Sequence, residues 1–529
     1  MRLLKNRPTR RAGVVALAVG AVSAVTLAGT PAYAADNTRL GTKLAREVTV
    51  NNVNRHLIAF QRIAEQNGGN RAASTPGYDA SAAYVHDKLA AAGWNVSYQE
   101  FDYDFLVETE SLTEVSPTPR SFPSVDIFEF SPETPDAGIT APLAVVANGQ
   151  NPTGPGCVAT DFDSADYTGK IALIQRGGCN FSIKQINAAE AGAIGVLIYN
   201  NATNPDEPVN GTLGSAADAR VPTGGLTRAE GEQLVADAAA GPVTVNLVLQ
   251  TEVEVRTTTN VIAETPGGRA DNVVMAGAHL DSVPAGPGIN DNGTGSAGLL
   301  EVGLKLADER VKNKVRLAFW GAEELSLLGS EYYVSQLSFE QQLDIALYLN
   351  FDMIGSPNFA RFVYDGDDSD AVGAGPGPFG SAQIEDLFTG YFDSRSLPSE
   401  GTDFSGRSDY GPFIAVGIPS GGLFTGAEGI KTPEQAARYG GTAGIAYDLC
   451  YHAACDNLGN VNRTALDQNA DAVAFAVGRY ALDTSDINGV GAAGAKASAA
   501  ARKAKADRLA KVARRTAATH VHTHGAAAA

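Results

Sequence analysis

The feature that most constrains the fold is an alternation of short apolar segments with amphipathic segments in the second half of the chain. The predicted strands are residues 272–278, 315–320 and 345–351, and the predicted helices between them are residues 294–307 and 328–337. Such alternation predicts an α/β fold, with a mainly parallel mixed sheet flanked by helices on both faces. In sheets of this kind, functional side chains gather at the carboxyl ends of the strands.

The rest of the chain divides by composition. Two helical patterns and a strand pattern before residue 101 begin an α/β domain. Around residues 132–142 the composition shifts to Pro, Gly and Thr, and the patterns that follow, up to about Val253, belong to a different unit. We therefore predict a domain in two parts, residues 35–137 and 253–486, with an inserted β-rich α/β domain at residues 138–252.

Both ends of the chain look unlike parts of a folded core. Residues 1–34 combine basic residues, an apolar run and the small-residue site Ala32-Tyr33-Ala34, which predicts a secretory signal peptide. A membrane anchor is the alternative, and Arg10-Arg11 leaves twin-arginine export open. Residues 487–529 are basic and Ala-rich and contain His520, His522 and His524. We expect a disordered or processed tail, with metal scavenging or surface binding as its alternative.

Export permits disulfide bonds between the four cysteines. Three pairings are formally possible, and proximity in the sequence favours Cys157 with Cys179 and Cys450 with Cys455. The shorter loop encloses the residues Tyr451 and His452. We expect this loop to hold those two side chains in place.

The charge of the chain limits its partners. The formal net charge is −19 although both ends are basic, so the body between them is strongly acidic. An acidic body argues against a groove for nucleic acid and suits an extracellular enzyme that binds metal ions or cationic substrates. No stretch after the signal peptide is apolar enough to predict a membrane span. We expect a secreted monomer with no nucleic-acid or membrane partner.

Metal-binding residue types follow the successive predicted strands. In chain order they are His279, Asp281, Asp291, Glu323, Glu324 and Asp352. Adjacent carboxylates after an apolar strand are costly to desolvate unless a cation compensates their charge. Mixed nitrogen and oxygen ligands suit zinc, although cobalt or manganese would accept the same ligands. One Asp can bridge two metals for hydrolysis, and Glu323, beside Glu324, is placed to act as general base.

This order of residues, completed by Tyr451-His452, resembles that of the di-zinc aminopeptidases of the zinc exopeptidase superfamily. Over about residues 44–110 and 255–485 the chain resembles the calcium-activated, leucine-type aminopeptidases that streptomycetes secrete. The matching segments are Gly277-Ala-His-Leu-Asp-Ser, Trp320-Gly-Ala-Glu-Glu-Leu, Asn350-Phe-Asp-Met-Ile-Gly-Ser-Pro and Gly421-Gly-Leu-Phe-Thr-Gly-Ala. The resemblance implies that the protein removes large apolar first residues, such as Leu, from peptides and proteins.

The resemblance also implies two zinc ions per chain and their ligands. The first zinc would be held by His279 and Asp352, the second by Glu324 and His452, and Asp291 would bridge both. Asp281 would orient the ligand His279.

The residues that would meet the substrate follow from the same resemblance. Glu323 would be the general base on the zinc-activated water, and the Tyr451 hydroxyl would stabilise the oxyanion. The substrate amino group would contact Glu323, Asp352 and the backbone carbonyl of Arg407. The apolar pocket for the first side chain would be lined by Met353 and Phe424.

Calcium is a further expectation from the resemblance. The site would comprise Glu47, the carbonyl of Val48, Asp467 and Asp471, because two carboxylates one helical turn apart can share a hard cation. A solvated acidic helix face is the alternative explanation of the same carboxylates.

The sequence departs from the resemblance at two positions. Relatives often have a second Asp after the bridging Asp, joined to it by a cis bond, and this chain has Asn292 there. The His of a Ser-Asp-His-x-Pro-Phe stretch common in relatives is replaced by Tyr410. Neither departure removes a predicted zinc ligand.

The inserted unit resembles a protease-associated domain in the segments that begin at Gly169 and Ala188, and a lid or substrate-selecting role is implied. A carboxypeptidase or dipeptidase of the same superfamily is the nearest alternative function, but it would need basic side chains for the substrate carboxylate, and only Arg407 is near the ligands. A binding module with an inactive peptidase fold would have lost a ligand or the base. Motifs of serine hydrolases and nucleotide-binding loops are absent.

Overall fold

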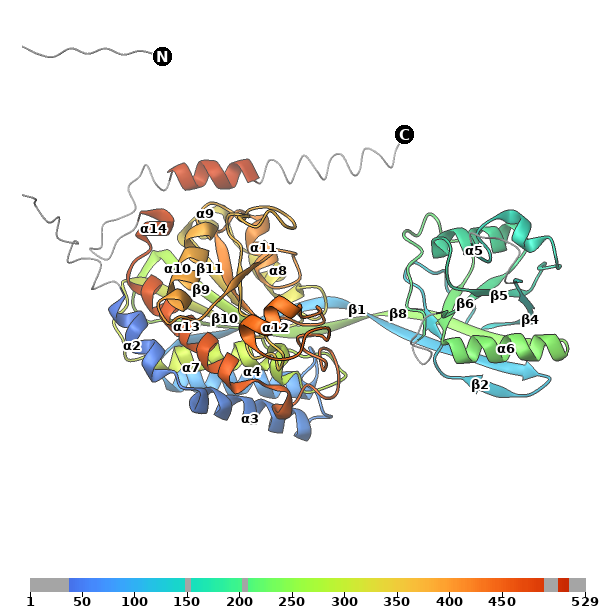
Figure 1. Ribbon diagram of the computed structural model, residues 1–529, viewed down its shortest axis with the longest axis horizontal. Helices are drawn as coiled ribbons and strands as arrows, with labels where there is room; N and C mark the ends of the chain where they lie inside the picture. The colour runs from blue at the N-terminus through green and yellow to red at the C-terminus, as the bar shows by residue number, and fades with distance from the viewer. Residues whose placement is uncertain (1–37, 148–153, 202–207, 490–502, 513–529) are drawn as a thin grey trace, which may run out of the picture. The chain divides into compact units, whose positions relative to one another are not determined.

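The computed structural model describes residues 38–147, 154–201, 208–489 and 503–512. These residues form two compact units, unit 2 being Phe101–Thr258 and unit 1 the described residues on either side of it (Figure 1). The long strands β1 (Asn95–Ser116) and β8 (Thr244–Glu264) each contribute residues to both units. The predicted signal peptide and the three histidines of the tail lie outside the described residues.

The sheet of unit 1 is mainly parallel, as the alternation of strand and helix patterns predicts. Its strands, in spatial order, are β13 (Glu400–Thr402), β12 (Phe362–Tyr364), β14 (Ser420–Phe424), β11 (Ile345–Phe351), β9 (Arg269–His279), β10 (Asn313–Trp320) and the end of β8. The central strands β14, β11, β9 and β10 are parallel, whereas β12 runs antiparallel to β14 and β8 antiparallel to β10.

The central strands are buried on both faces, because successive side chains along each strand enter different cores. In β10, Leu317 and Phe319 belong to one apolar cluster, while Ala318 and Trp320 belong to another. These side chains are fully buried. Burial of a large apolar side chain contributes about 1.5–3 kcal/mol, so the two clusters anchor the strands firmly.

Helices supply the other side of each cluster, which confirms the predicted fold class (Figure 1). Residues of the larger cluster come from α2 (Arg39–Glu47), α3 (Val50–Gln66), α4 (Pro76–Ala91), α7 (Gly295–Leu306), α10 (Ser381–Asp393), α13 (Arg463–Leu482) and α14 (Ser485–Asn488). Those of the smaller cluster come from α8 (Leu328–Ser335) and α11 (Tyr410–Ala415). The short helices α9 (Phe339–Asp344) and α12 (Pro433–Tyr439) complete the unit.

The strands of unit 2 continue the hydrogen-bonded order from β8. The order is β8, β4 (Ile139–Val145), β5 (Ile171–Gln175), β6 (Gly195–Tyr199), β7 (Thr223–Leu226) and β3 (Asp126–Ile127), and β1 pairs with β2 (Arg120–Phe122). Helices α5 (Phe181–Glu190) and α6 (Arg228–Ala240) pack on the apolar clusters of the unit. The unit is wider than the predicted insertion 138–252, because β1, β2 and β3 also belong to it.

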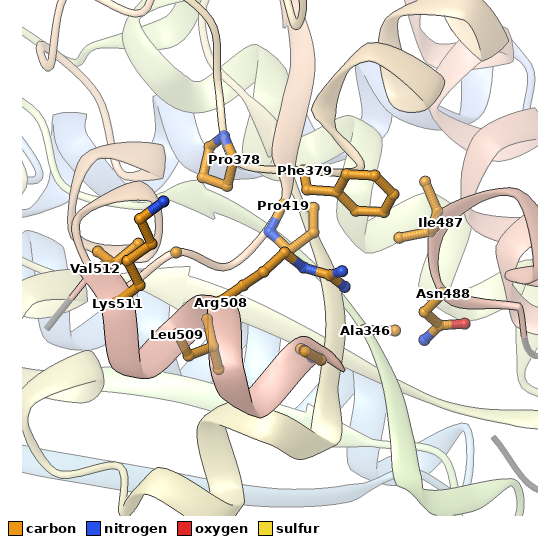
Figure 2. A pocket seen from close by; sticks show the side chains of 12 residues that line it. Ala346, Pro378, Phe379, Pro419, Ile487, Asn488, Arg508, Leu509, Lys511 and Val512 are labelled. Carbon is orange, nitrogen blue, oxygen red and sulfur yellow. The ribbon is translucent and has the colours of Figure 1, made fainter. Parts of the chain in front are cut away.

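Part of the tail differs from the expectation of disorder. Residues 503–512 form a helix that packs on unit 1, and its Leu509 is 2% exposed (Figure 2). The Lys505 ammonium donates a hydrogen bond to the carbonyl of Leu343 at 2.9 Å, and the Arg508 guanidinium lies 4.3 Å from the centre of the Phe379 ring. These contacts fix a helix that is poor in large apolar residues. None of the helices among the described residues is long and apolar enough to cross a membrane.

Candidate active site

The parallel strands bring the predicted metal ligands to one edge of the sheet. His279 is the last residue of β9, Glu323 and Glu324 follow β10, and Asp352 follows β11. Strand β9 lies between β10 and β11 and is parallel to both, so the three carboxyl ends are adjacent. Asp291 reaches the same edge from the turn that precedes α7.

Asp291 lies between the two histidines of the site. Its Oδ1 atom is 3.3 Å from Nε2 of His279, and its Oδ2 atom is 3.3 Å from Nε2 of His452. The Nε2 atom of His279 is also 3.3 Å from Oδ1 of Asp352, and that of His452 is 2.9 Å from Oε2 of Glu324. Two groups of three ligand atoms therefore share Asp291.

The donor set fits zinc. Each of the two groups offers one imidazole nitrogen and two carboxylate oxygens, which is a mixture that zinc accepts. The buried atoms Oε1 of Glu324 and Oδ1 of Asp352 accept no hydrogen bond from any of the described residues. Buried carboxylate oxygens are costly without a compensating partner, and a cation between the ligands would supply one.

The pKa shifts within the cluster also favour bound cations. Burial raises the pKa of Glu323 well above its usual range and that of Glu324 to about 7. Burial lowers the pKa of His279, but the charges of Glu323 and Asp352 outweigh it, and the net result is a strong rise. The pKa of His452 rises to about 10, because its hydrogen bonds to Asp291 and Glu324 outweigh its burial. The cluster thus has an excess of negative charge that cations neutralise.

Asp281 is fully buried directly behind these ligands. Its Oδ1 atom is 3.5 Å from Nδ1 of His279 and accepts a hydrogen bond from the backbone N–H of Glu323 at 3.3 Å. The Oδ2 atom accepts the backbone N–H of Glu324 at 3.2 Å. One carboxylate therefore positions residues of two strand ends.

Both predicted disulfides are present. Cys157 pairs with Cys179 in unit 2, and Cys450 pairs with Cys455 in unit 1. The latter closes the loop of Tyr451 and His452, whose rings stack with their centres 3.9 Å apart. The His452 backbone has a φ of 55°, and its side chain is 41% exposed. The disulfide therefore constrains a ligand that is less buried than the others.

A cavity of about 90 Å³ opens beside the ligands. The predicted substrate-contact residues Met353, Arg407 and Phe424 all line it, as do Glu323, Asp352 and Tyr451. Other residues that line the cavity have no signal in the sequence, among them Tyr364, Thr402, Asp403 and Ser405. The Arg407 guanidinium donates a hydrogen bond to the Tyr451 oxygen at 3.3 Å and pairs with Glu428 at 2.7 Å.

Asn292 and Tyr410, the two residues that depart from the resemblance, both form hydrogen bonds with the backbone. The Asp291–Asn292 bond is cis. The Asn292 amide donates to the carbonyl of Phe351 at 2.9 Å and accepts the backbone N–H of Met353 at 3.1 Å. Tyr410 is buried, and its hydroxyl oxygen accepts the backbone N–H of Gly406 at 3.0 Å.

The predicted calcium ligands do not form a cluster like that of the predicted zinc ligands. The Oδ1 atom of Asp467 accepts the backbone N–H of Val50 at 3.1 Å. Burial and the charge of Asp467 raise the pKa of Asp471 to about 7. The carboxylate of Glu47 lies 3.8 Å from the Lys43 ammonium. These three carboxylates are not among the groups of described residues whose ligand atoms lie within 4.8 Å of one another.

Several residues that support the site were also missed. The buried Arg71 guanidinium donates to the carbonyls of Pro287 at 2.8 Å and Gly288 at 2.6 Å, and Ser408 donates to Oδ2 of Asp352 at 2.6 Å. Burial lowers the pKa of Arg71 to about 10. These residues are distant in sequence from the groups they contact. Arg71 lies in no motif, and the motif that contains Ser408 does not indicate its contact with Asp352.

Comparison with known proteins identifies the class. The model of peptidase family M28 matches residues 260–477, and the model of the PA domain matches residues 139–234. An aminopeptidase of Pseudomonas aeruginosa is 46% identical over 462 residues, which are 86% of this chain and 85% of the relative. A probable leucine aminopeptidase 2 of Aspergillus fumigatus is 52% identical over 357 residues, 67% of this chain and 69% of the relative.

The fold agrees with these matches. The structure of a zinc aminopeptidase from Bacillus subtilis is similar with a TM-score of 0.60 and 26% identity, over 81% of this chain and 94% of that chain. The chain belongs to peptidase family M28. It is a zinc aminopeptidase that carries an inserted PA domain.

Proposed function

We propose that this aminopeptidase is a di-zinc enzyme that releases large apolar first residues, such as Leu, from the N-termini of peptides and proteins. The single observation that carries the proposal is the placement of Asp291, whose two oxygens are each 3.3 Å from Nε2 of a different histidine. In the proposal, His279 and Asp352 would hold one zinc, Glu324 and His452 would hold the other, and Asp291 would contribute to both.

Glu323 is the general base in this proposal. Its carboxylate lines the cavity, and burial raises its pKa well above the usual range. A carboxylate with a raised pKa can take a proton from the attacking water and pass it to the leaving amine. When bound, the two zinc ions would polarise the scissile carbonyl and lower the pKa of water.

The substrate would be oriented by polar groups at the cavity. Its amino group would contact the carboxylates of Glu323 and Asp352 and the carbonyl of Arg407, which predicts a requirement for a free N-terminus. The Tyr451 hydroxyl would donate a hydrogen bond to the oxyanion. Because the Arg407 guanidinium already donates to the Tyr451 oxygen, the hydroxyl proton is available for the substrate.

The pocket residues support a preference for apolar first side chains. Met353 and Phe424 line the cavity, and the Phe424 ring stacks on that of Phe362 with their centres 6.0 Å apart. Aliphatic side chains such as Leu gain from burial against such surfaces. The preference of a hydrophobic pocket for one apolar side chain over a smaller one is worth about 1–3 kcal/mol.

The proposal extends to the rest of the molecule. We propose that the protein is secreted, which the predicted signal peptide and the two disulfides support. We also propose that it is a monomer. Calcium at Glu47, Val48, Asp467 and Asp471, as in the aminopeptidases of streptomycetes, is part of the same proposal. The PA domain would select among long substrates.

The test is hydrolysis of leucine p-nitroanilide beside its N-acetylated form, by mature protein before and after chelation. We expect cleavage of the free amine alone, loss of activity with the chelator and recovery with two equivalents of zinc. Cleavage of the acetylated substrate would contradict the exopeptidase site. Full recovery with one equivalent would contradict the zinc pair.

A further inference from the structure

Three consecutive backbone N–H groups beside the shared ligand all donate to one residue, Asp456. Its carbonyl oxygen accepts the N–H of Ile289 at 3.1 Å. Its Oδ1 accepts the N–H of Asn290 at 2.8 Å, and its Oδ2 accepts the N–H of Asp291 at 2.9 Å. Asp456 is 2% exposed, so these bonds are shielded from water.

Asp456 is also tied to the loop that carries His452. It directly follows Cys455, the second cysteine of the disulfide that closes the loop. The backbone N–H of Asp456 donates to the carbonyl of Ala453 at 3.0 Å, inside the same loop. A displacement of Asp456 would therefore move the His452 loop and the backbone of Asp291 relative to each other.

The start of the loop is attached to the same turn by a second carboxylate. Asp448 accepts the N–H of Cys450 at 2.8 Å and the side-chain amide of Asn290 at 2.7 Å. The amide of Asn460 donates to Asp448 at 2.9 Å and to Oδ1 of Asp456 at 3.0 Å. Both ends of the disulfide loop are thus hydrogen-bonded to the turn of the shared ligand.

These hydrogen bonds of Asp456 and Asp448 support the metal position formed by Asp291, Glu324 and His452 more than the position formed by Asp291, His279 and Asp352. His452 is the only predicted zinc ligand on the loop, and the loop rather than a strand fixes its place. His279 and Asp352 are held by β9 and β11 and by their own contacts. A displacement of Asp456 would therefore act on two ligands of one position, Asp291 and His452. It would act on Asp291 alone at the other position, whose His279 and Asp352 are held independently.

We propose that Asp456 is a positioning residue that holds Asp291 against His452 and thereby sets the affinity of the metal position formed by Asp291, Glu324 and His452. The inference rests on the proposed pair of zinc ions. Asp456 is not itself a ligand, since both of its oxygens accept backbone N–H groups. Residues that orient ligands in this way change metal affinity by about 10–100-fold when they are replaced.

The test is a competitive zinc titration of wild-type protein and Asp456→Asn against a chromophoric chelator. In the variant, an NH₂ group replaces one carboxylate oxygen of Asp456. This group cannot accept the backbone N–H that the oxygen accepts in the wild type. We expect two zinc ions to bind to both proteins, with one affinity about 10–100-fold weaker in the variant and the other weakened clearly less. We further expect kcat to fall at limiting zinc and to recover at raised free zinc, which a general loss of packing would not produce.

Two further variants separate positioning from stability. Asn272→Ala removes buried hydrogen bonds at the opposite end of β9, and it should lower the thermal midpoint of the zinc-free protein without changing either zinc affinity. Asn460→Ala, a milder change if Asp456→Asn fails to fold, should weaken the same zinc more than the other, by a smaller factor than Asp456→Asn does.

The outcomes are distinguishable. Equal weakening of both zinc ions, or unchanged affinities in Asp456→Asn, would overturn the inference while the proposed function stands. If Asp456→Asn does not fold, unchanged or equally weakened affinities in Asn460→Ala would overturn it. Wild-type protein that binds fewer than two zinc ions would overturn both.

Discussion

Asp281 lies with its Oδ1 atom 3.5 Å from Nδ1 of His279, while both of its oxygens accept backbone N–H groups from the end of the neighbouring strand. This one carboxylate links the ligand on β9 to the Glu323-Glu324 pair after β10. Its position explains how two strand ends keep a fixed separation.

Replacement of Asp281 by Asn should therefore weaken zinc binding. The amide nitrogen would oppose at least one of the donors that now face the carboxylate, and the polarisation of His279 would be lost. We expect a loss of about 10–100-fold in zinc affinity, measured by titration with a chelator. An unchanged affinity would show that backbone packing alone holds His279.

Glu323→Ala should retain both zinc ions and lose hydrolysis. In our proposal this carboxylate moves protons and is not a zinc ligand, so kcat should fall by about 10²–10⁴-fold. Metal analysis of the purified variant checks the first expectation, and the rate on leucine p-nitroanilide checks the second. A variant with normal activity would disprove the assignment of the base.

Phe424→Ala should change specificity more than it changes chemistry. Removal of the ring widens the pocket and takes away contact with the first side chain. We expect kcat/KM for Leu relative to Ala substrates to fall about 10-fold or more. The exposed Phe339 is a control, since it lies on α9 outside the cavity lining. Equal effects of Phe339→Ala and Phe424→Ala would contradict the pocket assignment.

Glu385 should make the stability of the protein depend on pH. Burial raises its pKa from 4.5 to about 7, although its carboxylate accepts the N–H of Gly366 at 2.8 Å. The folded state then binds more protons than the unfolded state between these values, so its contribution to stability falls as the pH rises from about 4.5 to about 7.

Glu385→Gln should remove this dependence. The variant should gain stability relative to wild type at pH 8 and little at pH 4.5, as measured by urea unfolding. Asp386→Asn, an exposed neighbour on the same helix, is the matched control. A wild-type slope retained in Glu385→Gln would show that other groups cause it.

The strands and most ligands could be predicted because their signals are local. Apolar runs such as Val315–Trp320 identify buried strands, and parallel pairing then places His279, Glu324 and Asp352 together without further information. His452 has no such signal, since it lies on a loop, and it was identified only by resemblance.

The supporting contacts could not be predicted in this way. Arg71, Asp456 and Ser408 have partners many residues away, so no spacing reports the contact. The helix at 503–512 was missed for a related reason. Its few apolar side chains include Leu509 and Val512, which line a cavity together with Phe379 and Pro419 of unit 1, and no sequence pattern reports that contact (Figure 2).

The central claim is that Asp291 joins two zinc ions. Crystals of mature wild-type protein, measured on both sides of the zinc absorption edge, test it most directly. We predict two anomalous peaks, one between Asp291, His279 and Asp352 and the other between Asp291, Glu324 and His452. A single peak in zinc-saturated crystals, or peaks that do not contact Asp291, would contradict the account.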